Sequence, residues 1–269
     1  MAGIETMIIE TKALTKRFGD FTAVDQVNLN VGAGEIFGLI GPNGAGKSTL
    51  IKMLTTLLPP SSGSATIAGF DLAKQPQKIR AHIGYVPQLL SADGALSGYE
   101  NLLLSARLYL VPRGERPARI AAALKMMGLE DAAGKLVQGY SGGMIRRLEI
   151  AQSMIHEPAI LFMDEPTVGL DPVARQTVWD HVRGLRDRLA TTILLTTHAM
   201  EEADELCDRI GILHVGRLET VAPPAALKAA VGPGATLDDV FARVAGTETE
   251  AGGSYRAVRE ARRSARAHS

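Results

Sequence analysis

The sequence predicts an α/β fold in which buried strands alternate with helices around a glycine-rich loop. Apolar runs typical of buried strands span 35–40, 160–163 and 192–196, and a segment with helical periodicity follows each of them. The glycine-rich run 41–49 lies directly between the first of these strands and its helix. With 269 residues, the chain is long enough to bury a large core as one or two closely packed domains.

The remaining elements are placed by the same patterns. The three helices are expected at 49–54, 173–189 and 199–207, and shorter strands are expected at 7–10, 27–31, 65–69 and 83–88. Pro87 is expected to terminate the last of these strands. No internal repeat is visible.

Between about 97 and 127 the apolar period changes to that of helices. Two helices are predicted there, on the apolar positions Leu102, Leu103, Ala106 and Leu110 and on Ile120, Ala123, Leu124 and Met127. The polar segment 112–117 separates them. The chain therefore carries a mostly helical insertion between its strand–helix halves.

Composition excludes several classes of protein. Lysine plus arginine and aspartate plus glutamate each total 29, so the net charge is zero and predicts no nucleic-acid partner. Cys207 is the only cysteine, which rules out an internal disulfide or a cysteine metal cluster, and we expect it to be a buried apolar residue rather than a reactive thiol. No segment approaches the roughly 20 apolar residues of a membrane span, and the first residues do not resemble a signal peptide. A membrane task would therefore need a separate membrane-embedded partner.

The glycine-rich run predicts a nucleotide phosphate site. It fits the pattern of a glycine, four residues, then Gly-Lys-Ser/Thr, and its members are Gly41, Pro42, Asn43, Gly44, Ala45, Gly46, Lys47, Ser48 and Thr49. Glycines let the backbone approach phosphate oxygens, and the following helix adds the positive end of its dipole. Lys47 is suited to the β- and γ-phosphates, and the Ser48 hydroxyl is suited to Mg²⁺.

Two carboxylates end the apolar run at 160–163. Asp164 suits Mg²⁺ coordination, and Glu165 suits polarising an attacking water. Adjacent carboxylates alone are also typical of a solvated strand end, but the phosphate loop favours the catalytic interpretation.

A third element is a Ser-Gly-Gly turn at Ser141, Gly142 and Gly143. A turn of this kind that opens a helix exposes backbone N–H donors at the helix N-terminus, where an anion binds well. Taken alone, it is an ordinary turn.

Taken together, these residues resemble the ATP-binding subunit of ABC transporters, over about residues 7–220. Six motifs occur in the family's order: the phosphate loop, Gln88, the turn at 141–143, the pair Asp164–Glu165, Asp171 and His198. The resemblance implies a P-loop NTPase core with an antiparallel β subdomain and an inserted α-helical subdomain, which is the ABC ATPase fold. It implies one ATPase domain at 1–246, with the helical insertion at about 89–155, and a flexible basic tail at 247–269.

Each matching residue takes a role from the resemblance. Alone, Gln88 and His198 would be taken as a surface amide and a hydrogen-bonded strand-end histidine. In the family, the glutamine binds Mg²⁺ and senses the membrane partner, while the histidine contacts the γ-phosphate. Asp171 matches the family's D-loop. The resemblance implies that Glu165, Lys47 and His198 form the catalytic set. The implied cofactors are ATP and Mg²⁺.

Two positions depart from the commonest family pattern. Phe18 stands where a tyrosine usually stacks on adenine; its ring keeps a π-face, although core packing is the alternative. Met144 replaces the usual glutamine after the turn, which removes one hydrogen-bonding side chain.

Three further segments are similar to the drug- and antibiotic-exporter branch of daunorubicin-resistance ATPases. They are Tyr140–Met144, Glu201–Asp204 and Thr236–Phe241. The resemblance implies an ATPase that powers export through a separate transmembrane permease at the cytoplasmic face of the membrane. It also implies a second ATPase subunit, expected to be another copy of this chain, whose turn at 141–143 covers the ATP held by its partner.

Two other functions remain open at this point. One is an ABC ATPase that acts on ribosomes or DNA without a membrane partner, although the chain has one phosphate loop rather than two. The other is a regulator that binds ATP without turnover, against which Glu165 and His198 argue. The arginines of the tail could contact anionic lipid headgroups, but a solvated chain end is the favoured interpretation, because chain termini are commonly exposed to solvent.

Overall fold

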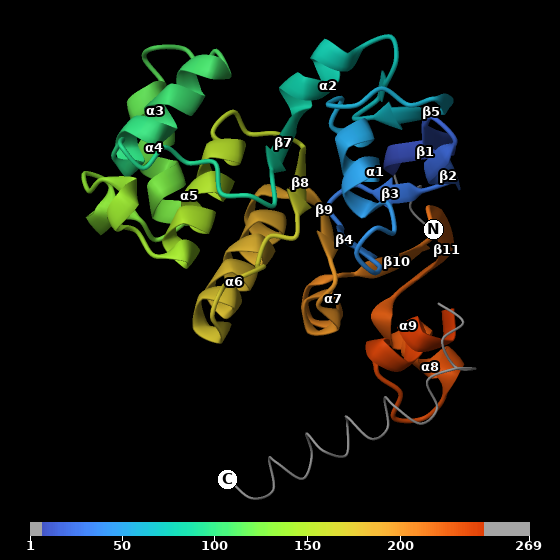
Figure 1. The fold of residues 1–269 in the computed structure, drawn as a ribbon. Helices are drawn as coiled ribbons and strands as arrows, with labels where there is room; N and C mark the ends of the chain where they lie inside the picture. Colours follow the sequence, from blue (N-terminus) through green and yellow to red (C-terminus); the bar gives the residue numbers. More distant parts are fainter. Residues whose placement is uncertain (1–6, 245–269) are drawn as a thin grey trace, which may run out of the picture.

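The computed structural model describes residues 7–244, and these form two β-sheets with helices packed around them (Figure 1). The predicted basic tail at 247–269 lies outside the described residues. Within the described chain, a six-stranded sheet has the order β11-β10-β4-β9-β8-β7, and a second sheet contains five strands.

The six-stranded sheet carries the strand ends that form the site. Its strands are β4 (Ile36–Ile40), β7 (Ile83–Val86), β8 (Ile160–Asp164), β9 (Thr192–Thr197), β10 (Arg209–His214) and β11 (Arg217–Ala222). All neighbours pair in parallel except β10 and β11, which are antiparallel. The apolar runs in the sequence predict β4, β7, β8 and β9, whereas β10 and β11 were not predicted.

Strand β4 shows why this sheet lies in the centre of the molecule. All five of its residues are buried, and Ile36 and Ile40 belong to one apolar cluster while Phe37 and Leu39 belong to the other. Because successive side chains point to opposite faces, the sheet is covered on both sides. A continuous apolar run is the expected pattern for such a strand.

The second sheet is antiparallel. It contains β1 (Met7–Phe18), β2 (Phe21–Val27), β3 (Asn30–Gly32), β5 (Ser62–Ile67) and β6 (Phe70–Asp71), with β1 central. The single strand predicted at 27–31 is wrong. The Thr11 hydroxyl donates to the carbonyl of Val27 and accepts from the N–H of Leu29. This side chain of β1 therefore interrupts the pairing with β1 at the point where β2 ends and before β3 begins.

The helical insertion lies between β7 and β8. It contains α3 (Gly98–Leu108), α4 (Arg116–Met126), α5 (Gly142–Met154) and the short 3₁₀ turns η1 (Glu130–Ala132) and η2 (Val137–Gly139). Ser97 and Glu100 form a capping box that starts α3. The polar break predicted at 112–117 lies earlier, at 109–115, because α3 ends at Leu108 and Pro117 is accommodated in the first turn of α4.

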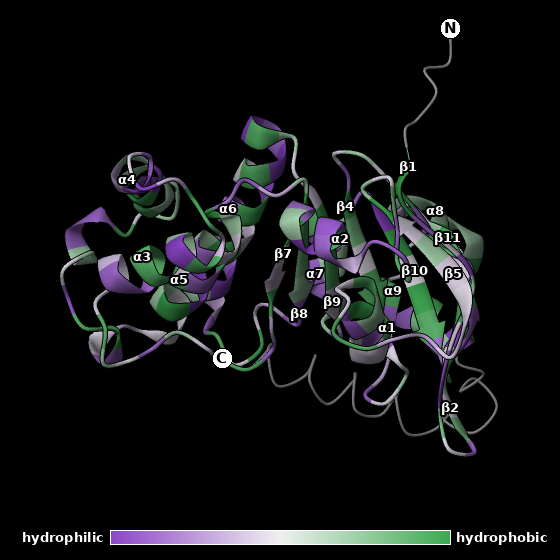
Figure 2. Ribbon diagram, turned by 90° about the horizontal axis from the view of Figure 1, so that it is seen from above, coloured by the Kyte–Doolittle hydropathy of each residue, from purple (hydrophilic) through white to green (hydrophobic). Residues whose placement is uncertain are grey.

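The other helices pack on the two faces of the central sheet and form the C-terminal end of the described chain. They are α1 (Lys47–Leu54), α2 (Pro76–His82), α6 (Pro172–Leu189), α7 (Met200–Leu206), α8 (Pro224–Val231) and α9 (Leu237–Val244). The two views agree that α5 and α1 lie on opposite sides of the molecule (Figures 1 and 2). The N-terminus of α1 and that of α5 are therefore separate places in one chain.

Candidate active site

The phosphate loop connects the end of β4 to α1. Gly46 has a φ of 105°, and a Cβ there would lie 2.3 Å from the carbonyl oxygen of Ala23. A Cβ on Gly41 would lie 2.3 Å from the carbonyl oxygen of Leu213. Both positions therefore require glycine, because a side chain would collide with a neighbouring backbone.

The first turn of α1 has no side-chain cap. Gly46 is the N-cap residue, and no side chain accepts a hydrogen bond from the helix N–H groups there. An N-terminus of this kind concentrates unpaired donors and the positive end of the helix dipole. The loop is thus built to receive an anion, as its sequence predicts.

Lys47 is the first residue of α1, and its ammonium group is folded over the loop. Its Nζ donates to the carbonyl oxygens of Gly41 at 2.7 Å and Pro42 at 3.1 Å. The same Nζ lies 3.6 Å from Oε1 of Glu165. Burial lowers the pKa of Lys47, and the nearby charges of Glu165 and Asp164 oppose that shift. The buried cation is held where the loop and the acidic strand end meet.

Asp164 ends β8 and accepts two hydroxyl hydrogen bonds on one oxygen. The Oγ1 of Thr196 donates at 2.6 Å and the Oγ of Ser48 at 3.1 Å. Burial, and secondly the charge of Asp164, raises the pKa of Tyr85 to about 12. A serine hydroxyl beside a carboxylate is a hard oxygen donor pair that suits Mg²⁺, an ion that keeps several waters and takes few protein ligands. The residues present therefore fit the cation that the sequence predicts.

Glu165 is buried at the centre of the site and contacts three other side chains. Its Oε2 accepts from Nε2 of Gln88 at 3.2 Å and lies 3.1 Å from Nδ1 of His198, while Lys47 approaches its other oxygen. Its φ is 49°, in the left-handed region, which costs a non-glycine residue roughly 1–2 kcal/mol. Its N–H is bonded to both the carbonyl and the hydroxyl of Thr196, which holds this conformation.

Parallel pairing explains why these distant residues meet. Strands β4, β8 and β9 are adjacent, so their carboxyl ends share one edge of the sheet. The structure brings together at this edge Lys47, Ser48, Gln88, Asp164, Glu165 and His198. Thr196, which donates to the carboxylate of Asp164 and accepts from the backbone N–H of Glu165, was not predicted as a site residue; the only signal was a run of threonines in an otherwise apolar strand.

The turn at 141–143 lies elsewhere. Ser141 is the N-cap of α5 and accepts from the N–H of Met144 at 3.3 Å, so the predicted turn at a helix start is present. A Cβ on Gly143 would lie 2.8 Å from that of Ala174, which shows that α5 packs closely against α6 here. Across residues 7–244, no hydrogen bond or ion pair joins this turn to the phosphate loop.

Asp171 also lies apart from the six clustered residues. Its carboxylate caps α6 by accepting from the N–H groups of Val173 at 3.0 Å and Ala174 at 2.9 Å. In this chain the aspartate therefore starts a helix beside the turn at 141–143.

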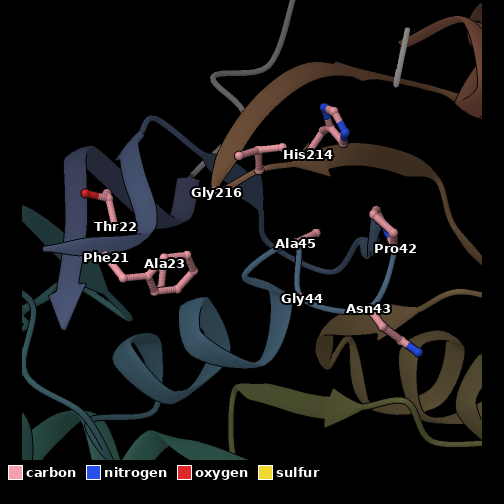
Figure 3. Close-up of a pocket in the computed structure, with 10 residues that line it drawn as sticks. Phe21, Thr22, Ala23, Pro42, Asn43, Gly44, Ala45, His214 and Gly216 are labelled. Carbon is pink, nitrogen blue, oxygen red and sulfur yellow. The ribbon is translucent and has the colours of Figure 1, made fainter. Parts of the chain in front are cut away.

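A cavity of about 160 Å³ adjoins the phosphate loop, and Phe21 rather than Phe18 lines it (Figure 3). Its walls come from 21–23, from 42–45 and from 214–216. Phe18 faces Phe21 across the β1–β2 pair, and its ring lies 5.2 Å from the ammonium group of Lys16. Phe18 is half exposed, so it does not pack in the core. Phe21 was not predicted as a site residue, although it stands only three residues after Phe18.

A buried carboxylate links the two segments that follow Glu165 and His198. Oε1 of Glu202, in α7, accepts from the Thr167 hydroxyl at 2.7 Å and from the indole N–H of Trp179 at 2.9 Å. Glu202 is almost fully buried. The position of α7 after His198 is thus fixed to α6.

Cys207 is buried, as predicted, and its sulfur contacts the backbone of β4. A Cβ on Gly38 would lie 2.5 Å from this sulfur. Burial raises the pKa of the thiol well above its usual value, with smaller effects from Glu202 and Asp208. Within the part of the chain that the structure describes, no helix combines the length and apolarity that crossing a membrane requires.

Comparison with known proteins agrees with this geometry. Residues 24–168 match the family described as ABC transporter. The chain is 45% identical over 227 residues to the daunorubicin/doxorubicin resistance ATP-binding protein DrrA of Streptomyces peucetius, covering 84% of this chain and 68% of the relative. The chain belongs to the ABC transporter family. The predicted family resemblance is confirmed.

Two further matches extend the comparison. The Nod factor export ATP-binding protein I of Rhizobium meliloti is 42% identical over 214 residues, which cover 80% of this chain and 64% of the relative. The dimeric post-hydrolysis structure of the ATP-binding cassette MJ0796, bound to ADP and Pi, has a TM-score of 0.72 at 28% identity and covers 80% of this chain and 98% of that one. The ABC ATPase fold is confirmed, and the chain is an ATP-binding subunit with ATPase activity coupled to transport.

Proposed function

We propose that this chain hydrolyses ATP to drive export of a drug-like, antibiotic-like or lipid-like compound through a separate membrane subunit. The contacts around Glu165 carry the proposal, because they place a buried carboxylate among Lys47, Gln88 and His198 at a phosphate-binding loop. Relatives named for daunorubicin resistance and Nod factor export support the direction of transport. The names of these relatives favour the transport role over one on ribosomes or DNA.

The chemistry proposed is attack of water on the γ-phosphate of ATP, which yields ADP and phosphate. Lys47 exchanges its carbonyl partners at Gly41 and Pro42 for phosphate oxygens. Glu165 accepts the proton of the attacking water, and His198 and Gln88 hold that carboxylate in place.

Ser48, Asp164 and Gln88 would hold Mg²⁺, which neutralises phosphate charge when it is bound. Thr196 orients the Asp164 carboxylate through its hydroxyl. The side-chain amide of Gln88 donates to Glu165, which leaves its oxygen to serve as the third donor.

We also propose that two copies of this chain pair so that Ser141, Gly142 and Gly143 of one cover ATP held by the other. In one chain, the two elements that would contact the nucleotide lie on opposite sides of the molecule (Figures 1 and 2). The dimeric cassette bound to ADP and Pi supports such an assembly. Asp171, at the start of α6 beside the turn, would face the partner as well.

A mixing experiment tests this pairing. Lys47→Ala and Ser141→Arg variants, each inactive alone, are combined in equal amounts, so that mixed pairs contain one site with an intact loop and an intact turn. ATPase activity is expected to return to roughly one quarter of wild type, because half of the pairs are mixed and each has one working site of two. Lys47→Ala mixed with Ser48→Ala is the control and stays inactive. Absence of recovery in the first mixture would contradict the shared site.

The membrane partner is expected to bind near 88–104. Leu89 is 82% exposed and Leu90 50% exposed, directly after Gln88, and Tyr99 and Leu104 on α3 are also exposed. Through this contact the chain would lie at the cytoplasmic face of the membrane. After cell lysis it is expected in the membrane fraction, and a Leu89→Asp, Leu90→Asp variant is expected to leave it. Recovery of the wild-type chain with ribosomes or DNA would contradict the proposal.

A further inference from the structure

Helix α5 binds the free edge of strand β7 through side chains. Within residues 7–244, β7 pairs only with β8, so alternate carbonyls on its other edge need partners. His156, just beyond α5, contacts the carbonyl of Ile83 at 3.0 Å, and the Ser153 hydroxyl donates to that of Tyr85 at 3.0 Å. The helix therefore takes the place of a neighbouring strand.

The contact is close enough to exclude a side chain on the strand. A Cβ on Gly84 would lie 2.4 Å from the carbonyl oxygen of Ser153. Because the two backbones are in close contact at Gly84 and Ser153, β7 and α5 form one packed unit there.

A buried ion pair extends this contact beyond the end of the strand. The Nη1 of Arg146 donates to the carbonyl of Pro87 at 2.7 Å, and Nη2 donates to that of Gln88 at 2.8 Å. Glu149 lies 3.0 Å from Arg146, and its carboxylate accepts from both the N–H and the hydroxyl of Ser91. The two side chains hold the main chain of 87–91 from both ends.

The energetics favour a positioning role for this pair. Arg146 and Glu149 are each 2% exposed, and removing two charges from water costs about as much as their attraction returns. Such a pair contributes little to stability compared with apolar residues of similar size. What it supplies is one defined position for a loop that lacks regular structure.

The ion pair connects two parts of the proposed site, Gln88 and the helix that begins at the turn 141–143. The side chain of Gln88 donates to Glu165, while its carbonyl is bound by Arg146. Arg146 stands in the second turn of the helix that Ser141 caps. The exposed Leu89 and Leu90 lie inside the held loop.

We propose that Arg146 and Glu149 are positioning residues that fix the loop 87–91 to α5, so that a permease pressing on Leu89 and Leu90 moves Gln88 and the turn at 141–143 together. The proposal rests on the proposed function for its partner. It assigns the coupling to the ion pair rather than to general contact between the helices.

Steady-state ATPase measurements test the proposal with a matched control on the same helix. Arg146→Lys keeps the charge but cannot donate hydrogen bonds to the carbonyls of both Pro87 and Gln88. We therefore expect kcat to fall about 10-fold, with KM changed less than about 2-fold. Arg147→Lys is the control, because Arg147 binds the carbonyls of Met127 and Gly128 within the helical insertion instead. Equal loss in both variants would overturn the proposal.

A double-mutant cycle separates positioning from simple destabilisation. If Arg146 acts through Gln88, adding Arg146→Lys to a Gln88→Ala chain reduces kcat much less than it does in the wild type. Ser91→Ala, which removes one hydroxyl contact, is a milder variant should Arg146→Lys lower the melting temperature. Effects on kcat that simply multiply would overturn the assignment.

Hydrogen–deuterium exchange gives a readout that does not depend on turnover. Arg146→Lys is expected to raise amide exchange in both 87–91 and 141–144, whereas Arg147→Lys leaves both unchanged. Faster exchange confined to one of the two segments would overturn the coupling. A wild-type chain without ATPase activity would instead count against the proposed function, and the exchange result would stand on its own.

Discussion

The phosphate loop and the turn at 141–143 are both glycine-containing starts of helices, yet they differ in what surrounds them. Lys47 and Ser48, at the loop, contact Asp164 and Glu165 within the same chain. The hydroxyl of Ser141 accepts only from the N–H of Met144, in its own helix, among the described hydrogen bonds. The first is an assembled site with acidic, basic and amide groups in contact. The second is a helix start that lacks such groups within the described chain, and we propose that a second copy supplies them.

The largest effect is expected at the assembled end, from Glu165→Gln. The amide cannot accept the proton of the attacking water, so kcat should fall about 10³-fold while ATP still binds. Phosphate release measured at saturating ATP checks this, and equilibrium binding of a fluorescent ATP analogue is the control. A normal rate would show that another group is the base.

Lys47→Ala and Ser141→Ala distinguish the two ends through nucleotide binding. Lys47→Ala removes a charged donor to phosphate and should weaken ATP binding about 10- to 100-fold. Ser141→Ala should leave ATP binding to an isolated chain unchanged and reduce hydrolysis, because in the proposed pairing that turn contacts the nucleotide held by the partner. Titration calorimetry at low protein concentration measures both. Equal loss of binding in the two variants would place both ends at one chain's site.

Phe21→Ala and Phe18→Ala test the base-binding side of the assembled end. Stacking on one aromatic ring contributes about 1–3 kcal/mol, so loss of the ring that contacts adenine should raise the Kd for ATP about 5- to 100-fold. We expect the larger change for Phe21, which lines the cavity beside the loop. A larger change for Phe18 would support the prediction made from sequence and would mean that the β1–β2 hairpin moves when nucleotide binds.

The smallest effect is expected at Cys207, beneath the assembled end. Because burial raises its pKa, the thiol stays protonated at pH values where a free cysteine ionises, near 8.5. Alkylation of the native chain should therefore stay slow from pH 7 to pH 9 and become fast once denaturant is added. Mass spectrometry measures the labelled fraction. Rapid native labelling would show that β4 and α7 separate readily, and that the assembled end is less rigid than its contacts indicate.

Much of the assembled end was predictable because its signals are local. A glycine pattern before a lysine, and two carboxylates after an apolar strand, identify Lys47, Ser48, Asp164 and Glu165 without knowledge of their neighbours. Gln88 and His198 were found only through the order of the family motifs, since each is unremarkable alone. Thr196 and Phe21 were missed, because a threonine in a strand and a phenylalanine in a hairpin carry no distinctive pattern. Glu202 lies in a segment that the family resemblance singled out, but its buried contacts with Thr167 and Trp179 were not predicted.

The sequence by itself determined the α/β class, the phosphate loop and the chemistry of its side chains, because backbone freedom and strand burial follow from residue type and spacing. Tertiary structure alone decided that β4, β8 and β9 align their ends, that Phe21 rather than Phe18 lines the cavity, and that Arg146 and Glu149 hold the loop after β7. Each of these depends on which segments become neighbours after the chain folds, and contacts between residues tens of positions apart leave no periodic trace in the sequence.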